Sequence, residues 1–230
     1  MALIFVTGSD TGVGKTHVAG LLARRLSRDG FTQVIKPVES GAGAGRPADA
    51  KKAAGKWAEA HTLLTLPAPI APLAAAKKAR KPLDLALLLK LYRAVPQAPC
   101  RVVEGAGGVA VPIDPKGKDW ADFAAAIKPT VAIVVVQDRL GAINQARLAI
   151  SYLRRRYDGP IGVWLNAIKK PSKEVAAANR AGLAESWIPL LGESGKARSL
   201  PASISCRGER SPAAAPASVP RPARRVVAAP

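Results

Sequence analysis

A chemically suggestive stretch, VTGSDTGVGKT, spans residues 6–16 of this 230-residue chain. A glycine-rich run that follows a short apolar segment and ends in Lys15 and Thr16 is typical of a phosphate-binding loop. In such a loop the backbone N–H groups and the start of the next helix face an anion. The lysine neutralises the terminal phosphates, and the hydroxyl can ligate Mg²⁺. The stretch therefore predicts a site for nucleotide phosphates.

The spacing of the glycines departs from the simplest phosphate-loop pattern. That pattern places a glycine five residues before Gly14, where this chain has Ser9, and the available Gly8 lies one residue further back. The loop is therefore a variant with one extra residue, and the alternative is a glycine-rich turn with a lysine on the surface. We favour nucleotide binding because a strand is expected before the loop and a helix after it.

Three further polar residues, Lys36, Glu104 and Asn166, each end an apolar segment that we predict to be a strand. Taken singly, each has a structural explanation as a strand-end charge or a turn cap. Ligands of open parallel sheets bind beyond the carboxyl ends of the strands, so the three should meet the phosphate loop at one edge. A second lysine and a carboxylate beside such a loop predict phosphoryl transfer, with Mg²⁺ held by Thr16 and Glu104.

The elements that must position these residues alternate between short apolar strands and amphipathic helices. Runs such as VAIVVV are apolar without alternation, which is typical of strands buried on both faces of a parallel sheet. We predict an α/β fold, a doubly wound and mostly parallel sheet with helices on both faces, similar to P-loop NTPases. The predicted strands are residues 3–6, 32–36 (ended by Pro37), 101–103, 131–136 and 161–165. The predicted helices are residues 16–28, 48–61, 82–95, 120–127, 142–156 and 173–186, with a proline-rich loop at 66–76.

The sequence changes character from residue 194 onward. Residues 194–230 are rich in Pro, Ala, Ser and Arg and show neither a helical nor a strand period. They offer too little apolar surface to offset the entropy of ordering. We therefore predict one P-loop domain at residues 1–193 and a disordered basic tail at 194–230.

The net charge bears on the partners of the chain. A formal net charge of +19 could indicate nucleic acid or anionic substrates as partners. No basic stripe is interleaved with aromatic residues, so we interpret the charges as solvated and predict no nucleic-acid partner.

Other features bear on the compartment. The longest strongly apolar run, VAIVVV, is far shorter than the roughly 20 residues of a membrane-spanning helix, so we predict no membrane association. The N-terminus lacks the basic region of a signal peptide, and Cys100 and Cys206 lie far apart. These features predict a cytoplasmic protein without a disulfide framework.

Several motifs occur in the order found in one known family. They are GSDTGVGKT at 8–16, KPVESG at 36–41, EGAGG at 104–108, LGAIN at 140–144, the strand-end Asn166 and PLLGE at 189–193. Over roughly residues 2–193 the chain resembles the dethiobiotin synthetase family. Related loops occur in other ATP-using amidoligases, so the resemblance rests on the ordered set.

The resemblance implies a homodimeric, ATP-dependent cyclo-ligase of biotin biosynthesis. Family members close the ureido ring of dethiobiotin from 7,8-diaminopelargonic acid, CO₂ and MgATP. One substrate amine captures CO₂ as a carbamate, which attacks the γ-phosphate to give a carbamic–phosphoric anhydride. The second amine then closes the ring and releases phosphate, with ADP as the other product.

The resemblance also implies roles for individual residues. The catalytic cations are Lys15 and Lys36, and Mg²⁺ is held by Thr16, Asp49 and Glu104, with Asp49 assigned from the segment PADA. The ATP-binding residues are Asp10, Thr11, Gly12, Val13, Gly14, Lys15, Thr16, Glu104 and Asn166, the last of which reads adenine. The substrate-binding residues are Thr11, Lys36, Ser40, Gly107 and Gly108, together with Gly141 and Asn144 of the other subunit.

The chain departs from the family at several positions. Gly12 stands where some members have Glu, and Leu73 and Gln145 stand where His is usual. After PLLGE the family continues with a segment that lines the adenine and ribose site, whereas this sequence changes abruptly. We therefore predict weaker ATP binding or lower stability than in a complete member.

Three other functions stay open. A partition-type ATPase would need a second lysine five residues before Lys15, where this chain has Asp10. Another amidoligase usually carries a glutaminase domain with a cysteine nucleophile, which does not fit within this length. A non-catalytic remnant would suit the divergent tail, but intact Lys15, Lys36 and Glu104 argue against it.

Overall fold

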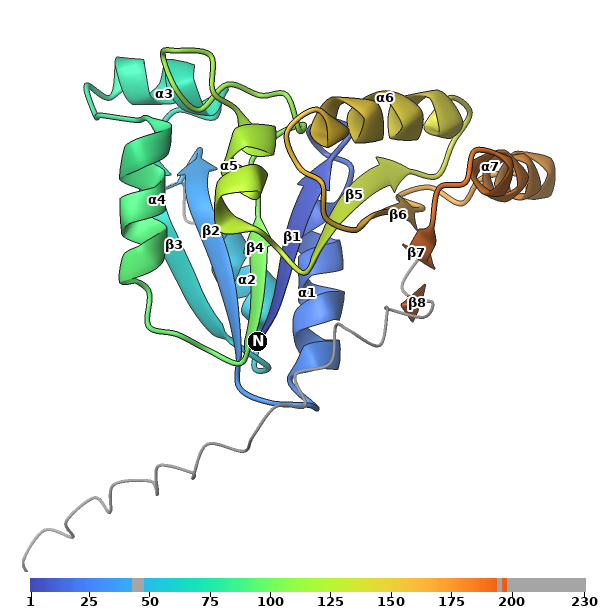
Figure 1. Ribbon diagram of the computed structural model, residues 1–230, viewed down its shortest axis with the longest axis horizontal. Helices are drawn as coiled ribbons and strands as arrows, with labels where there is room; N and C mark the ends of the chain where they lie inside the picture. The colour runs from blue at the N-terminus through green and yellow to red at the C-terminus, as the bar shows by residue number, and fades with distance from the viewer. Residues whose placement is uncertain (43–47, 194–195, 198–230) are drawn as a thin grey trace, which may run out of the picture.

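One sheet organises the described residues, 1–42, 48–193 and 196–197, of the computed structural model (Figure 1). Among these residues the sheet has eight strands in the order β3-β2-β4-β1-β5-β6-β7-β8. Strands β1 to β7 pair in parallel, and β8 is antiparallel to β7. The strands are β1 Ala2–Gly8, β2 Thr32–Ser40, β3 Glu59–Leu66, β4 Cys100–Glu104, β5 Val131–Gln137, β6 Ile161–Asn166, β7 Leu190–Glu193 and β8 Lys196–Ala197.

Helices cover both faces of this sheet (Figure 1). Ile4 and Val6 of β1 belong to one core with the first two helices, whereas Leu3 and Phe5 belong to a second core with the remaining helices. Successive side chains of a strand point to opposite faces, so both faces of β1 are buried. This arrangement confirms the predicted doubly wound α/β fold. The helices are α1 Lys15–Leu26, α2 Asp49–Ala54, α3 Pro72–Lys78, α4 Leu85–Ala94, α5 Trp120–Ile127, α6 Ala142–Arg154 and α7 Lys173–Glu185.

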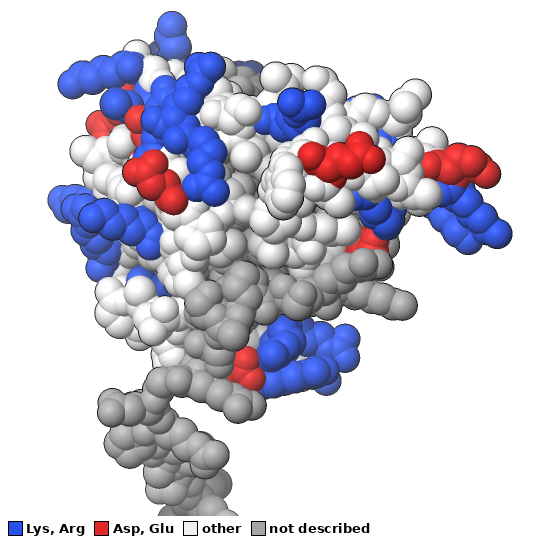
Figure 2. Space-filling view, turned by 45° about the vertical axis from the view of Figure 1, so that its right-hand side comes forward, with Lys and Arg blue, Asp and Glu red and all other residues white. Residues whose placement is uncertain are grey.

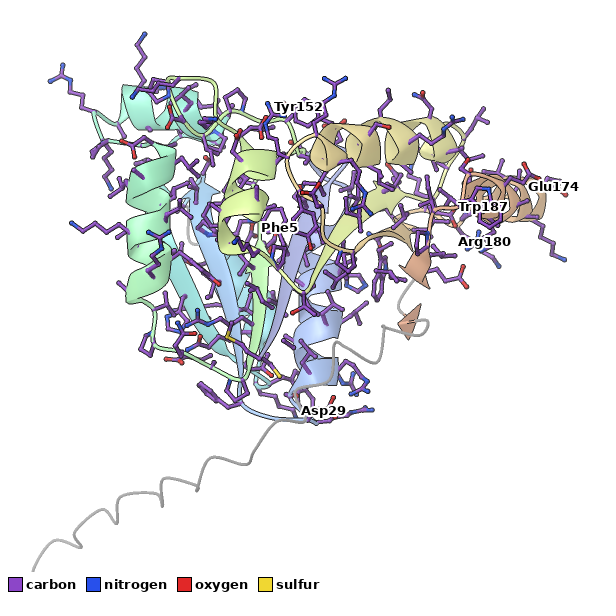
Figure 3. All side chains as sticks on the ribbon, in the orientation of Figure 1. Phe5, Asp29, Tyr152, Glu174, Arg180 and Trp187 are labelled. Carbon is purple, nitrogen blue, oxygen red and sulfur yellow. The ribbon has the colours of Figure 1, made fainter. Side chains whose placement is uncertain are left out.

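Helix α5 ties the second core to the loop after β4. Its start is fixed by a capping box, in which Asp119 accepts from the backbone of Asp122 and the Asp122 carboxylate accepts from Asp119 N–H. Trp120 is fully buried and its indole N–H donates to the carbonyl oxygen of Ala106 at 2.6 Å. Phe5, labelled in the sheet in Figure 3, lies 6.2 Å from Phe123, centroid to centroid. Aromatic packing thereby holds the EGAGG loop at the edge of the sheet.

The predicted end of the second strand at Pro37 is wrong. Strand β2 continues to Ser40, and beyond Ile35 it pairs with β3 alone. Proline lacks a backbone N–H, so it is tolerated where a strand has a neighbour on one side only. The three residues that follow Pro37 therefore extend β2 to the carboxyl end of the sheet, where they line the cavity described below.

Two predictions in the next segment also need correction. The helix predicted at 48–61 ends at Ala54, where Gly55 adopts a left-handed φ of 51°, and residues 59–66 form β3. The predicted loop at 66–76 contains the start of α3, which has Pro72 in its first turn. The first error arises because β3 is only half buried along most of its length and so lacks a clear alternation of apolar and polar residues. The second arises because prolines precede and begin α3.

The remaining predictions concern the tail, the cysteines and membranes. Lys196–Ala197 of the predicted tail form β8, and the disorder predicted for the other residues from 194 onward lies outside the described residues. Cys100 is disulfide-bonded, which departs from the prediction of a protein without a disulfide framework. None of the described helices has the length and apolar composition needed to cross a bilayer.

The packing of α1 generates the first testable prediction. Leu22 is fully buried between α1 and the sheet, so Leu22→Ala should lower the free energy of unfolding by about 2–5 kcal/mol. The matched control is Leu148→Ala on α6, where the side chain is 64% exposed and the change should stay within about 0.5 kcal/mol. Urea unfolding followed by circular dichroism measures both, and equal losses would contradict this packing.

Candidate functional site

A cavity of about 710 Å³ opens at the carboxyl edge of β1, β2 and β4. This is the edge at which ligands bind in open parallel sheets. Its lining combines the phosphate loop, the end of β2, the start of α2 and the loop after β4. The lining residues are Thr11, Gly12, Gly14, Lys15, Thr16, Lys36, Val38, Glu39, Ser40, Asp49, Pro69, Ile70, Ala71, Pro72, Glu104, Ala106, Gly107 and Val111.

The phosphate loop turns back on itself through residues with left-handed backbone. Gly12 has a φ of 75° and Gly14 has a φ of 93°, values that favour glycine. A Cβ atom at Gly14 would lie 2.0 Å from Nδ2 of Asn166. That amide donates a hydrogen bond to the carbonyl oxygen of Val13 at 2.9 Å. The end of β6 therefore holds the middle of the loop, and only glycine fits beside it.

Lys15 projects into the cavity from the first turn of α1. Its Nζ donates to the carbonyl oxygen of Asp10 at 2.9 Å, and its side chain is only 7% exposed. Burial, followed by repulsion from Lys36, lowers the pKa of Lys15 from 10.5 to about 8. The positive charge of Lys15 is thus costly in the free protein, and an anion at the loop would stabilise it.

Glu104 joins the second lysine to the start of α1. Its Oε1 accepts from Nζ of Lys36 at 2.5 Å and from Oγ1 of Thr16 at 2.8 Å. Nζ of Lys36 also lies 3.2 Å from Oδ2 of Asp49. Burial acts to lower the pKa of Lys36, but attraction to Glu104 and Asp49 outweighs it and raises the pKa. Lys36 therefore holds its proton more firmly than a lysine in water.

The oxygen atoms around Glu104 suit a hard divalent cation. Among the described residues Oε2 of Glu104 is buried without a hydrogen-bond partner. The hydroxyl of Thr16 and the carboxylate of Asp49 stand beside the same cavity. No group of three or more acidic, His or Cys ligands occurs within the described part of the chain. Such a sparse set matches Mg²⁺, which keeps several waters and shares substrate phosphates.

The structure brings most of the predicted substrate residues to this cavity. Thr11, Ser40 and Gly107 line it, and Oγ of Ser40 is buried without a hydrogen-bond partner in the described chain. A Cβ atom at Gly108 would lie 3.3 Å from the carbonyl oxygen of Ser9. The glycines of EGAGG thus let the two loops approach closely.

Gly141 and Asn144 lie elsewhere in the same chain. They line a second cavity of about 760 Å³ between α6 and α7, together with residues such as Leu140, Arg147 and Val175. A single chain does not bring them to Lys15. This separation is compatible with the expectation that they serve the site of another subunit.

Sequence reasoning missed Glu39 and an apolar wall. Glu39 is buried, and its Oε1 accepts from the backbone N–H of Asp49 at 2.9 Å, so it fixes the start of α2. It escaped prediction because Pro37 was expected to end the strand that carries it. Ile70, Pro72 and Val111 form an apolar wall of the cavity; such loop positions carry no local signal.

On the face that Figure 2 shows, the basic residues are dispersed. Figure 2 shows Lys and Arg in several separate groups over the face in view, with Asp and Glu near some of them. Arg25 pairs with Asp29 and Lys118 pairs with Asp122. The face shown has no continuous basic stripe, in agreement with the interpretation of the charges as solvated.

Comparison with known proteins identifies the family. A family model described as an AAA domain matches residues 3–199. ATP-dependent dethiobiotin synthetase BioD of Anaeromyxobacter dehalogenans (strain 2CP-C) is 41% identical over 170 residues, which cover 71% of this chain and 75% of that protein. The protein of the same name from Akkermansia muciniphila is 34% identical over 201 residues, covering 84% and 92%. The chain belongs to the dethiobiotin synthetase family. Proteins of this name are ATP-dependent ligases, so the predicted enzyme class is confirmed.

Solved structures support the fold of this family member. A plasmid partition protein from Borrelia burgdorferi bound to AMPPNP matches with a TM-score of 0.51 and 11% identity, covering 91% of each chain. A ParA family ATPase from Chlorobium tepidum matches with a TM-score of 0.51 and 13% identity, covering 84% of each chain. At such identities the likeness concerns the fold alone. It agrees with the predicted P-loop NTPase-like architecture.

The pKa of Lys15 predicts how nucleotide binding depends on pH. Below pH 8 the free protein already carries the charged Lys15, so binding of an anionic phosphate needs no proton uptake there. Above pH 8 the free lysine is neutral and must take up a proton, so the Kd for ATP should rise by up to about tenfold per pH unit. Lys36 has a raised pKa and stays charged over this range.

Isothermal titration calorimetry between pH 7 and 9.5 measures this dependence. Lys15→Met should bind ATP weakly, with a Kd that does not change over the same range. A wild-type Kd that stays constant across this range would contradict the assignment of Lys15 as the phosphate-binding cation.

Proposed function

We propose that this chain is a dethiobiotin synthetase that uses MgATP to carboxylate 7,8-diaminopelargonic acid and close its ureido ring. One observation carries the proposal in this member of the family. Glu104 holds Lys36 and Thr16 on a single carboxylate oxygen, at the rim of a cavity that also contains Lys15. Two buried cations beside a phosphate loop suit a reaction that joins a carbamate to a phosphoryl group.

The reaction proceeds in three steps. One substrate amine adds to the carbon of CO₂ and loses a proton, which gives a carbamate. A carbamate oxygen attacks the γ-phosphorus of ATP while the bond to the bridging oxygen breaks, which forms the carbamic–phosphoric anhydride and releases ADP. The second amine attacks the carbonyl carbon, the bond from that carbon to the phosphoryl oxygen breaks, and dethiobiotin and phosphate result with loss of a second proton.

The two lysines have different tasks in this scheme. Lys15 belongs to the phosphate loop, where an anion would relieve the cost of its burial, so it binds the β- and γ-phosphates. Lys36 is held by Glu104, where it orients the carbamate and stabilises charge on the transferring phosphoryl group. Each such fixed charge typically contributes about 10²–10³ in rate.

Thr16, Asp49 and Glu104 would hold Mg²⁺ with the phosphates of ATP. The unpartnered Oε2 of Glu104 supports this assignment. Mg²⁺ supplies neutralisation of the charge on the transferring phosphate. The carboxylate of Glu39 would keep Asp49 in place through the backbone N–H of that residue.

The remaining walls of the cavity suit the diamine. Ile70, Pro72 and Val111 offer apolar surface for its methylene chain. The hydroxyl groups of Thr11 and Ser40 stand near the phosphate loop, where they would meet the amines and the carbamate.

The distant carboxylate of the substrate would be bound by a second copy of the chain. Gly141 and Asn144 lie outside the cavity of their own chain, so we propose a homodimer in which these residues complete the partner's site. We further propose that the protein acts in the cytoplasm with small molecules as its substrates.

Direct assay tests the proposed activity. Purified protein with 7,8-diaminopelargonic acid, bicarbonate and MgATP should form dethiobiotin, detected by mass. Lys15→Met and Lys36→Met should each lower the rate by about 10²–10³. Lys90→Met on the exposed side of α4 is the matched control and should leave the rate unchanged.

Absence of product from the wild-type protein while it still binds ATP would overturn the substrate assignment and favour another amidoligase reaction. Absence of both product and ATP binding would favour an impaired family member. Equal rates for the two lysine variants and the control would contradict the roles of the lysines.

Subunit mixing tests the shared site. In the proposed dimer, Lys15 and Asn144 of one site come from different subunits. Each of the variants Lys15→Met and Asn144→Ala therefore impairs both sites of its own homodimer and should have low activity. Random reassociation of an equal mixture should restore about one quarter of the wild-type rate, since half of the dimers regain one intact site. No recovery after confirmed subunit exchange would contradict the composite site.

A further inference from the structure

A polar cluster lies behind the edge of the sheet, next to the nucleotide loop but outside the cavity that contains Lys15. One of its members, Asn179, lines the second cavity. The members of the cluster are Asp138, directly after β5, Asn179 and Arg180 of α7, and Glu193 at the end of β7. Asp138 and Asn179 are 2% and 3% exposed. Figure 3 places Arg180 where α7 meets β7. The mechanism above makes no use of these residues.

Arg180 binds two carboxylates from different strand ends. Its Nε donates to Oε2 of Glu193 at 2.6 Å, and its Nη2 lies 3.1 Å from Oδ2 of Asp138. The second oxygen of Asp138 accepts from Nδ2 of Asn179 at 2.7 Å. Each oxygen of the buried Asp138 carboxylate therefore has a donor, which is the condition under which a buried charge is tolerated.

Hydrogen bonds through Asn166 connect the cluster to the nucleotide loop. The backbone N–H of Asp138 donates to the carbonyl oxygen of Asn166 at 3.0 Å. Asn166 in turn holds the carbonyl oxygen of Val13 and packs against Gly14. The position of Asp138 thus fixes the residue that supports the middle of the phosphate loop.

Hydrogen bonds to the carbonyl oxygen of Arg139 connect the cluster to the start of α6. Nδ2 of Asn179 also donates to the carbonyl oxygen of Arg139 at 3.1 Å. The same carbonyl accepts from the backbone N–H of Ala142, the first residue of α6. Asn179 therefore anchors the turn that presents Gly141 and Asn144.

We propose that the Asp138–Asn179–Arg180 cluster is a positioning device that sets the phosphate loop of its own subunit and the Gly141–Asn144 loop together. None of its side chains touches a reactant in this account; they act through Asn166 and through the Arg139 carbonyl. The part that concerns the Gly141–Asn144 loop rests on the proposed function, whereas the part that concerns the phosphate loop rests on nucleotide binding alone.

The test compares Arg180→Gln and Asp138→Asn with Arg25→Gln. Arg25 also pairs with a carboxylate, Asp29 at 2.9 Å, but on the surface of α1, so it is the matched control for loss of an ion pair. Calorimetry gives the Kd for MgADP, steady-state kinetics gives kcat and the KM for the diamine, and thermal unfolding gives the Tm.

Displacement of both loops should raise the Kd for MgADP and the KM for the diamine by about tenfold in Arg180→Gln and Asp138→Asn. Lys15, Lys36 and Glu104 are untouched, so kcat at saturation should change less than about twofold. Arg180→Lys keeps a cation and should restore part of the affinity. The double variant Asp138→Asn/Arg180→Gln should have a Kd and a KM no higher than those of the more impaired single variant, because the residues act as one unit.

Two outcomes would overturn the inference. A lower Tm with unchanged Kd and KM would make the cluster a stabilising element only. A tenfold rise in KM without any change in the Kd for MgADP would remove its link to the phosphate loop. If the wild-type protein forms no dethiobiotin, the proposed function fails, but the MgADP titration still decides whether the cluster sets the loop.

Discussion

The buried ion pair between Lys36 and Glu104 is the constraint on which the rest of the site depends. Removing two charges from water is costly, and the cost is offset only when their geometry is close and further hydrogen bonds support the pair. Here the pair forms because β2 and β4 run in parallel with Ile35 beside Val103, so that Lys36 and Glu104 follow at the same level. Thr16 supplies a further donor to the same oxygen. Movement of either strand or of α1 would leave a buried charge unpaired. The fold and the electrostatics of the cavity therefore specify one another.

The surroundings of the two lysines shift their pKa values in opposite directions. Lys36 is neutralised by Glu104 and Asp49 and keeps its proton, so it is a fixed structural charge. Lys15 forms no ion pair within the described residues, and burial lowers its pKa. Its charge becomes favourable only when an anion arrives. A site with one compensated and one uncompensated cation binds phosphate at Lys15 and keeps the charge of Lys36 for the group that will receive the phosphoryl.

The edge residues could be predicted from the sequence because parallel strands of a doubly wound sheet all deliver their last residue to one side. That rule places Glu104, the last residue of β4, and the loop after β1 brings Lys15 to the same side. Lys36 reaches them from inside β2, four residues before that strand ends. The rule could not place Glu39, because proline is tolerated where a strand has one neighbour and the strand continues past it. Nor could it find the cluster of Asp138 and Arg180, which depends on how α7 packs between two strand ends far apart in the chain. Local pattern reveals which residues reach the edge, whereas long-range packing decides which of them support one another.

The central claim is that the carbamate of the diamine attacks ATP in a cavity shaped by these two lysines. The most direct measurement uses bicarbonate labelled with ¹⁸O and a reaction time short enough to limit exchange with water. If a carbamate oxygen attacks the γ-phosphorus, that oxygen leaves with the phosphoryl group, and the inorganic phosphate should carry one ¹⁸O atom for each ring closed. Phosphate without ¹⁸O, from a reaction that still produces dethiobiotin, would contradict the account.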